Sequence, residues 1–483
     1  MTVAPFDTVA AVSTPYGKGG VAVIRVAGDK ALAVAERVFA PLNGKPLSQC
    51  PDRTAVYGLV RDPEDGTVLD DALCTVFRGP RSFTGEDTAE IACHGGVLVT
   101  RNVLEACLRA GARQALPGEF TRRAYLNGKL SLEHAEALGN LLDAGNDEQV
   151  RLARAGMNGL LTDSAGVIYN TLMDVLSNME AGMDFPEEDL TEMPREEIRA
   201  LVGTAEGALE GLLHTYRTGH AIAEGIPTVI CGRPNVGKSA FYNRLVGREA
   251  AIVTAIAGTT RDVLTDTVSL GRVTLRLSDT AGLRETDDTV EMIGVERARK
   301  AVSEAELVLA LTDTEGEDPE TEALIRELTE GGKTVIRVYT KRDIRPIPAR
   351  PETAHPESAR PETARPESAR PTGSVSSHVP TVCLSSVTGE GFEELTRAVE
   401  TAFIDGDLRM GEEAVVFSAR QAAALREAAA CLRTAAANLD VGLPYDICAD
   451  DIRAAMGELG ALCGRDMSED VLGEIFSRFC VGK

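Results

Sequence analysis

The chain has 483 residues, of which 43% are hydrophobic, and a formal net charge of −24. That length exceeds what one hydrophobic core usually organises, so we expect several domains with ordinary globular cores. The acidic balance argues against a broad surface that coats nucleic acid, since such a surface needs clustered Lys and Arg, and leaves room only for a local basic patch.

Membrane and secretory classes are also disfavoured. No run of about 18 uninterrupted apolar residues is present, so no membrane span is expected. The first 17 residues carry Asp7 and lack a basic region, unlike a secretory signal. Ten cysteines occur without a C-x-x-C pair, which fits reduced thiols rather than a disulfide or zinc framework. The sequence therefore predicts a cytoplasmic protein.

Residues 1–120 predict a compact α/β domain. Short β-rich runs alternate there with helical stretches. We expect strands at 21–26, 54–60, 68–77 and 88–93 and helices at 30–40 and 97–110.

Residues 121–222 are rich in Ala, Leu and Glu at helical spacing, as at 130–142 and 198–213, and predict a helical domain. From residue 223 to 403, strands and helices alternate, which predicts a doubly wound, mostly parallel sheet. The expected strands are 226–231, 263–270, 272–278, 306–312, 334–340 and 380–385, and the expected helices 238–246, 291–304, 319–330 and 391–403. Residues 404–483 return to helix, most clearly at 417–439, so we interpret the α/β domain as inserted into one helical domain.

A five-residue unit of Pro, Glu, Ser or Thr, Ala, and Arg or His repeats over residues 350–371. Such a run cannot bury apolar surface, so we expect a disordered Pro-rich insertion at 346–377. We interpret it as a neutral expansion of a surface loop, with partner binding as the alternative.

Residues Gly232-Arg-Pro-Asn-Val-Gly-Lys-Ser239 match the phosphate-binding loop G-x-x-x-x-G-K-[ST] between a predicted strand and helix. The glycines let backbone N–H groups turn toward phosphates, Lys238 neutralises the β- and γ-phosphates, and Ser239 offers a hydroxyl to Mg²⁺. Downstream, Asp279-Thr-Ala-Gly282 ends a strand, and Gly258-Thr-Thr-Arg-Asp262 resembles a switch segment in which Thr260 is our choice of second Mg²⁺ ligand.

Thr340-Lys-Arg-Asp343 predicts guanine as the base, because Asp343 can accept two donors that adenine does not offer. Asn is usual where Thr340 stands, so we expect somewhat lower base affinity. Ser385-Ser-Val387 closes the base pocket. The predicted GTP-binding residues are Asn235, Val236, Gly237, Lys238, Ser239, Ala240, Thr254, Ala255, Ile256, Ala257, Gly258, Thr259, Thr260, Asp279, Thr280, Ala281, Gly282, Thr340, Lys341, Asp343, Ser385, Ser386 and Val387.

Leu283 stands where many small GTPases carry the Gln that positions the attacking water. The downstream acids Glu285, Asp287, Asp288 and Glu291 are the candidates for that task, and Arg261 is a further catalytic candidate beside Lys238. No arginine finger is identifiable.

Nearly the whole chain resembles the MnmE (TrmE) family of tRNA-modification GTPases. The motifs that carry the resemblance are GRPNVGKS, AIVTAIAGTTRD, DTAGLRE, the tail Phe479-Cys-Val-Gly-Lys483, and the segments 13–28, 82–96 and 117–138. The resemblance implies an α/β P-loop GTPase domain inserted into an all-α helical domain and preceded by an N-terminal α/β domain that binds folate and dimerises.

The resemblance also implies cofactors and partners. A homodimer would join the FAD-containing partner MnmG in a heterotetramer that adds an aminomethyl-type group to the wobble uridine of certain tRNAs. A tetrahydrofolate one-carbon derivative would supply carbon, and FAD would belong to the partner alone. By the same resemblance, folate would contact Arg25, Glu90, Lys129 and Lys483. K⁺ would bind Asn235, Thr254, Ile256 and Thr259 in place of an arginine finger, and Glu291 would orient the water.

Two alternatives stay open. Cys480 is either inert packing or a functional thiol beside Lys483. The second functional hypothesis is a ribosome-assembly GTPase switch, which shares the nucleotide motifs but usually appends a KH-like module. The acidic helical extension here lacks a GXXG loop in basic surroundings, which favours the tRNA-modification hypothesis.

Overall fold

The computed structural model describes residues 7–184, 193–248, 265–278, 301–313, 319–344, 379–406, 408–464, 469–477 and 479–482. The chain divides into two compact units. The first contains Met1–Asp143, Leu152–Leu213 and Gly411–Lys483, and the second contains Ala144–Arg151 and His214–Met410.

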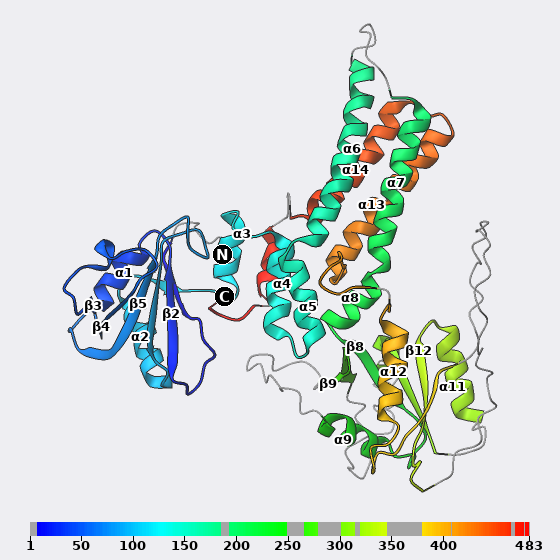
Figure 1. Ribbon diagram of the computed structural model, residues 1–483, viewed down its shortest axis with the longest axis horizontal. Helices are drawn as coiled ribbons and strands as arrows, with labels where there is room; N and C mark the ends of the chain where they lie inside the picture. The colour runs from blue at the N-terminus through cyan, green and yellow to red at the C-terminus, as the bar shows by residue number, and fades with distance from the viewer. Residues whose placement is uncertain are drawn as a thin grey trace, which may run out of the picture. The chain divides into compact units, whose positions relative to one another are not determined.

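A seven-stranded sheet organises the N-terminal part of the first unit. The strand order is β3-β4-β5-β6-β2-β1-β7, with only the β1–β7 pair parallel. The bounds are β1 Val9–Val12, β2 Val21–Ala27, β3 Phe39–Pro41, β4 Ala55–Arg61, β5 Val68–Phe77, β6 Thr88–His94 and β7 Arg113–Gln114. Alternate side chains of the central strands form one core with helices α1 (Ala31–Val38) and α2 (Val97–Arg109), and Figure 1 shows both helices with the sheet.

The helix predicted at 30–40 is α1, Ala31–Val38, so the prediction begins one residue too early and ends two residues too late. Phe39–Pro41 pairs with β4 as strand β3 instead. Pro41 explains the difference, because a residue before proline is pushed toward extended backbone and helices end there.

Helices make up the rest of the first unit. They are α3 Glu119–Leu126, α4 Leu132–Asp143, α6 Leu160–Asp184, α7 Arg195–His214, α13 Ala419–Asp440, α14 Tyr445–Leu462 and α15 Glu469–Ser477, with α5 (Asp147–Met157) divided between the two units. α13 starts with a capping box between Ser418 and Gln421, and it packs against α14, which also contacts α6. The long helices α6, α7, α13 and α14 run alongside one another in Figure 1. None of the helices in the described ranges is long and apolar enough to cross a membrane.

The second unit is built on a six-stranded sheet of order β13-β12-β11-β8-β10-β9, parallel except for the β9–β10 pair. The strands are β8 Ile226–Cys231, β9 Thr265–Leu270, β10 Val273–Ser278, β11 Leu307–Thr312, β12 Thr334–Tyr339 and β13 Thr381–Cys383. α8 (Tyr216–Ala223), α9 (Lys238–Arg248) and α12 (Phe392–Phe403) contribute to the core on one face, and α11 (Pro319–Glu330) packs on the other. The described elements follow the predicted alternation, while most of the helix predicted at 291–304 lies outside the described residues.

All ten cysteines are free thiols. Five are buried, four are partly buried and only Cys480 is exposed. Burial raises the pKa of Cys74 and of Cys107 to about 12, and that of Cys93 to about 11.

Candidate functional site

The loop between β8 and α9 turns its backbone through three residues with positive φ: Gly232 (148°), Asn235 (67°) and Gly237 (99°). A Cβ on Gly232 would lie 2.4 Å from the backbone oxygen of Leu311, so only glycine fits there. Positive φ angles of this kind turn the backbone N–H groups of the loop toward a common centre, where they can bind a phosphate chain.

Lys238 opens helix α9 and its ammonium group lies within the loop. The Nζ atom donates to the carbonyls of Gly232 and Arg233, each at 2.8 Å. Burial lowers the pKa of Lys238. Ser239, the next residue, is exposed at the start of the helix. A cation and a hydroxyl therefore stand at a helix N-terminus, where an anion is favoured.

The segment after β12 is joined to this loop by two side chains. Thr340 is 6% exposed, and its Oγ1 donates to the backbone oxygen of Val236 at 2.6 Å. Lys341, at φ 62°, donates from Nζ to the backbone oxygen of Asn235 at 2.8 Å and pairs with Asp313 at 2.7 Å. The predicted base-binding and phosphate-binding segments are thus held together directly.

Asp343 and Ser385 come from the ends of neighbouring parallel strands. Ser385 is fully buried and its hydroxyl donates to Asp343 Oδ1 at 2.6 Å. The Ser385 Oγ atom in turn accepts from the backbone N–H groups of Val387 and Thr388, at 3.2 and 3.1 Å. The exposed Asp343 carboxylate is therefore oriented by Ser385, and its other oxygen accepts no hydrogen bond from the residues that the structure describes.

A second polar site lies on the face of the N-terminal sheet opposite α1 and α2. Arg25 of β2 and Glu90 of β6 are register partners, and Arg25 Nε donates to Glu90 Oε1 at 2.9 Å. The guanidinium carbon lies 5.4 Å from the ring centres of both Phe83 and Phe120. Its Nη1 atom is buried and has no hydrogen-bond partner within the described residues. A buried charged donor without a hydrogen-bond partner lowers the stability of the fold, and a ligand that accepts this hydrogen bond removes the penalty.

Lys129 lies against the loop that carries Phe83. Its Nζ donates to the backbone oxygen of Pro80 at 2.8 Å, and Asn127 donates to the backbone oxygen of Thr84 at 2.7 Å. The segment after α3 is therefore fastened to the residues between β5 and β6.

The C-terminal tail reaches the same sheet. Val481 forms an antiparallel bridge with Pro117, and Ser13 Oγ donates to the backbone oxygen of Gly482 at 2.9 Å. Gly482 has φ 103°, and a Cβ there would lie 2.0 Å from the backbone oxygen of Val12. Val12 is the last residue of β1 and pairs with Ile24, the residue before Arg25, so the tail ends at the strand that neighbours the one carrying Arg25.

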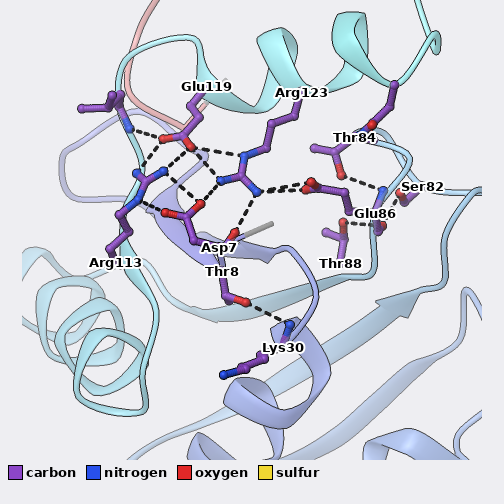
Figure 2. A network of polar contacts seen from close by, with 12 residues as sticks. Asp7, Thr8, Lys30, Ser82, Thr84, Glu86, Thr88, Arg113, Glu119 and Arg123 are labelled. Atoms are coloured by element: carbon purple, nitrogen blue, oxygen red, sulfur yellow. Dashed lines mark hydrogen bonds and ion pairs between the residues drawn. The ribbon is translucent and has the colours of Figure 1, made fainter. Parts of the chain in front are cut away.

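An ionic network joins the start of the chain, the loop before β6 and α3 (Figure 2). Arg123 is 7% exposed and bonds to Glu86, Glu119 and Asp7, while Arg113 bonds to Glu119 and Asp7. Burial would raise the pKa of Glu119, but hydrogen bonds from Arg113, from the Leu116 amide and from Arg123 lower it. Burial raises the pKa of Glu86, and Arg123 offsets that effect only in part.

Residues 8–129 match the family model described as the N-terminus of the GTP-binding protein TrmE, and residues 132–480 match that of the MnmE helical domain. The chain belongs to the MnmE family. The family resemblance and the fold class given by the sequence are both confirmed.

Full-length relatives named tRNA modification GTPase MnmE agree with this assignment. The protein of Symbiobacterium thermophilum is 45% identical over 99% of this chain and 99% of its own length. That of Geobacillus thermodenitrificans is 37% identical over 99% of both. The G domain of the T. maritima FeoB iron transporter is 24% identical over 36% of this chain and 97% of its own, with a TM-score of 0.22 that adds nothing to the assignment.

Several predicted site residues lie outside the described residues. They are Thr254, Ala255, Ile256, Ala257, Gly258, Thr259, Thr260, Arg261, Asp279, Thr280, Ala281, Gly282, Glu291 and Lys483, together with the repeat at 350–371. Sequence reasoning missed the Arg123 network. The segment 117–138 was noted as a family motif, but nothing in it points to Glu86 or Asp7 as partners of Arg123.

Proposed function

We propose that the chain hydrolyses GTP and, with the FAD-dependent partner MnmG, installs an aminomethyl or carboxymethylaminomethyl group on carbon 5 of the wobble uridine of certain tRNAs. The observation that carries the nucleotide part is the bond between Ser385 and Asp343, which orients a carboxylate beside the phosphate-binding loop. A carboxylate in this position can accept the N–H groups of guanine.

The base assignment is tested by Asp343→Asn. An amide no longer accepts both guanine donors, so preference shifts from GTP to xanthosine triphosphate. Competition binding with the two nucleotides measures the shift, and Glu330→Gln on α11 serves as a surface control. Unchanged GTP affinity in Asp343→Asn removes this residue from the base site.

Hydrolysis requires cations, and the side chains available fit them. Ser239 and Thr260 would hold Mg²⁺, which neutralises phosphate charge. The side chains of Asn235, Thr254 and Thr259, together with the backbone carbonyl of Ile256, would hold K⁺ through hard oxygen donors. The described member of the K⁺ set, Asn235, has an exposed side chain on backbone fixed by Lys341. Lys238 and Arg261 would stabilise developing charge, and Glu291 would orient the attacking water.

The K⁺ assignment predicts that GTP hydrolysis rises steeply with K⁺ and much less with Na⁺. Asn235→Ala removes that preference. A rate indifferent to the monovalent cation in the unmodified chain points to an arginine finger instead.

A tetrahydrofolate one-carbon derivative is the ligand proposed for the N-terminal site. Arg25 offers a buried donor that has no hydrogen-bond partner in the described part of the chain, Glu90 can accept from a pterin, and Lys129 and Lys483 can pair with the glutamate tail. Equilibrium dialysis with reduced tetrahydrofolate tests this. Arg25→Ala weakens binding by at least about tenfold, as expected for loss of charged hydrogen bonds.

A homodimer that binds MnmG as a heterotetramer and acts on tRNA completes the proposal. Deletion of the gene removes the modified wobble nucleoside, measured by mass spectrometry of tRNA hydrolysates, and the tagged chain co-purifies with a flavoprotein. Unchanged tRNA nucleosides in the deletion strain favour the ribosome-assembly switch.

A further inference from the structure

Two aromatic rings enclose the Arg25 guanidinium, and they come from different segments. Phe120 belongs to α3 and is fully buried, whereas Phe83 belongs to the loop between β5 and β6 and is 37% exposed. Both ring centres lie 5.4 Å from the guanidinium carbon. A cation is attracted to the ring face at this distance, so the position of Phe83 affects where Arg25 points.

The Phe83 loop is folded on itself around Glu86. The Ser82 hydroxyl donates to the backbone oxygen of Glu86, and the Glu86 amide donates to Thr84 Oγ1 at 3.2 Å. Figure 2 shows both contacts beside the ionic network. Because these bonds lie on both sides of Phe83 in sequence, the loop moves with Glu86.

Glu86 is in turn attached to α3 by Arg123. Arg123 Nη1 lies 3.3 and 3.1 Å from the two Glu86 oxygens, and the side chains are 7% and 13% exposed. Arg123 keeps Glu119 and Asp7 as partners if Glu86 is lost, so its own position does not depend on Glu86. Arg123 sits three residues after Phe120 on the same helix, so this ion pair ties the segment carrying one ring to the segment carrying the other.

We propose that Arg123 and Glu86 are positioning residues of the folate site, whose ion pair closes Phe83 on Arg25. The proposal rests on the proposed folate function of Arg25. Neither residue touches the ligand. Their effect passes through the loop to the ring and from the ring to the guanidinium.

The first test measures tetrahydrofolate affinity, with ascorbate keeping the ligand reduced. Glu86→Gln keeps the side-chain size and removes the charge, and it raises the dissociation constant about tenfold, the usual effect of losing a charged hydrogen bond. The matched control is Glu105→Gln, which breaks exposed pairs with Arg101 and Arg109 on α2 and leaves affinity unchanged. Arg123→Lys retains a charged donor group, so its dissociation constant for tetrahydrofolate lies between those of Glu86→Gln and Glu105→Gln.

The pH profile separates positioning from mere structural support. Glu86 is faced by Arg123 and Glu119 of α3 and by Asp29 between β2 and α1, and Asp7 shares Arg123 with it. Because burial raises the pKa of Glu86, the charged pair is present above that raised pKa and is lost as the pH falls through it. Folate affinity of the unmodified chain therefore falls over that acid range, while the Glu86→Gln variant shows a flat profile there.

A second test needs no folate. The chain contains no tryptophan, so Phe83→Trp introduces a single indole at the ring that covers Arg25. Adding Glu86→Gln to this variant increases acrylamide quenching of the indole at least twofold, whereas adding Glu105→Gln does not.

The outcomes separate the two proposals. If the chain binds no tetrahydrofolate, or Arg25→Ala leaves binding intact, the folate assignment fails and the quenching measurement alone decides the role of Glu86. If Arg25→Ala weakens binding but Glu86→Gln changes neither affinity nor quenching, the ion pair does not position Phe83 and this inference is overturned.

Discussion

Replacing Gly482 by alanine should release the C-terminal tail from the N-terminal sheet. At φ 103° an alanine is strained by about 1–2 kcal/mol. Its Cβ would also approach the Val12 backbone oxygen to 2.0 Å, and no side-chain rotation relieves a contact with a strand backbone. The hydrogen bond from Ser13 and the bridge to Pro117 stabilise the docked tail by about 1 kcal/mol each. The strain offsets most of that stabilisation of about 2 kcal/mol, and the backbone clash adds to the strain, so the detached tail becomes the favoured state of the variant.

Carboxypeptidase digestion followed by intact-mass spectrometry measures the release. The Gly482→Ala variant loses Val481 and its neighbours at least tenfold faster than the unmodified chain, loses tRNA modification and keeps GTP hydrolysis. Gly457→Ala in α14 is the matched control, because a Cβ there meets nothing within 4 Å and alanine favours a helix. Equal digestion rates for Gly482→Ala and the unmodified chain would refute the clash, and loss of GTP hydrolysis would place the tail in the service of the nucleotide domain.

Three further predictions concern other parts of the chain. Thr340→Val leaves the Val236 carbonyl without its buried hydrogen-bond donor, so the affinity for guanine nucleotides, measured by fluorescence titration, falls about tenfold. Thr340→Asn keeps a donor at this position and retains the affinity. The His94–Asp70 hydrogen bond raises the pKa of His94, so NMR titration gives a value above about 6.5 that Asp70→Asn lowers. The stabilisation from this pair is complete below the unfolded-state pKa and disappears as the pH rises through the folded one. Glu291→Ala slows the chemical step in single-turnover assays at nearly unchanged nucleotide affinity, and the same loss in Asp287→Ala alone contradicts the assignment.

Sequence periodicity was sufficient for the second unit because its central strands, β8 and β11, are short, mostly apolar runs with little exposed surface. The strand predicted at 226–231 is β8, and the helix predicted at 319–330 is α11. Strand β1 (Val9–Val12) could not be predicted in the same way, because VAAV has no alternation between polar and apolar residues. Its strand character depends on pairing with β2 and β7.

The nucleotide motifs could be located from sequence because each follows a strand at fixed spacing. The motifs do not predict the side-chain contacts that join one motif to another. The Thr340 side chain was expected only to weaken base binding, yet its hydroxyl reaches the phosphate loop across 104 positions of sequence. Arg123 and Asp7 are separated by 116 positions, and contacts over such distances follow from tertiary packing rather than from local pattern.

The uneven burial of the thiols has a practical consequence for chemical labelling. Thiolate is the reactive form, and the raised pKa values of Cys74, Cys93 and Cys107 leave almost none of it at neutral pH. Cys480 is exposed and lies two residues before Gly482. A maleimide dye added briefly at neutral pH therefore attaches first at Cys480, so the docking of the tail can be followed by fluorescence anisotropy on the native sequence without an engineered cysteine.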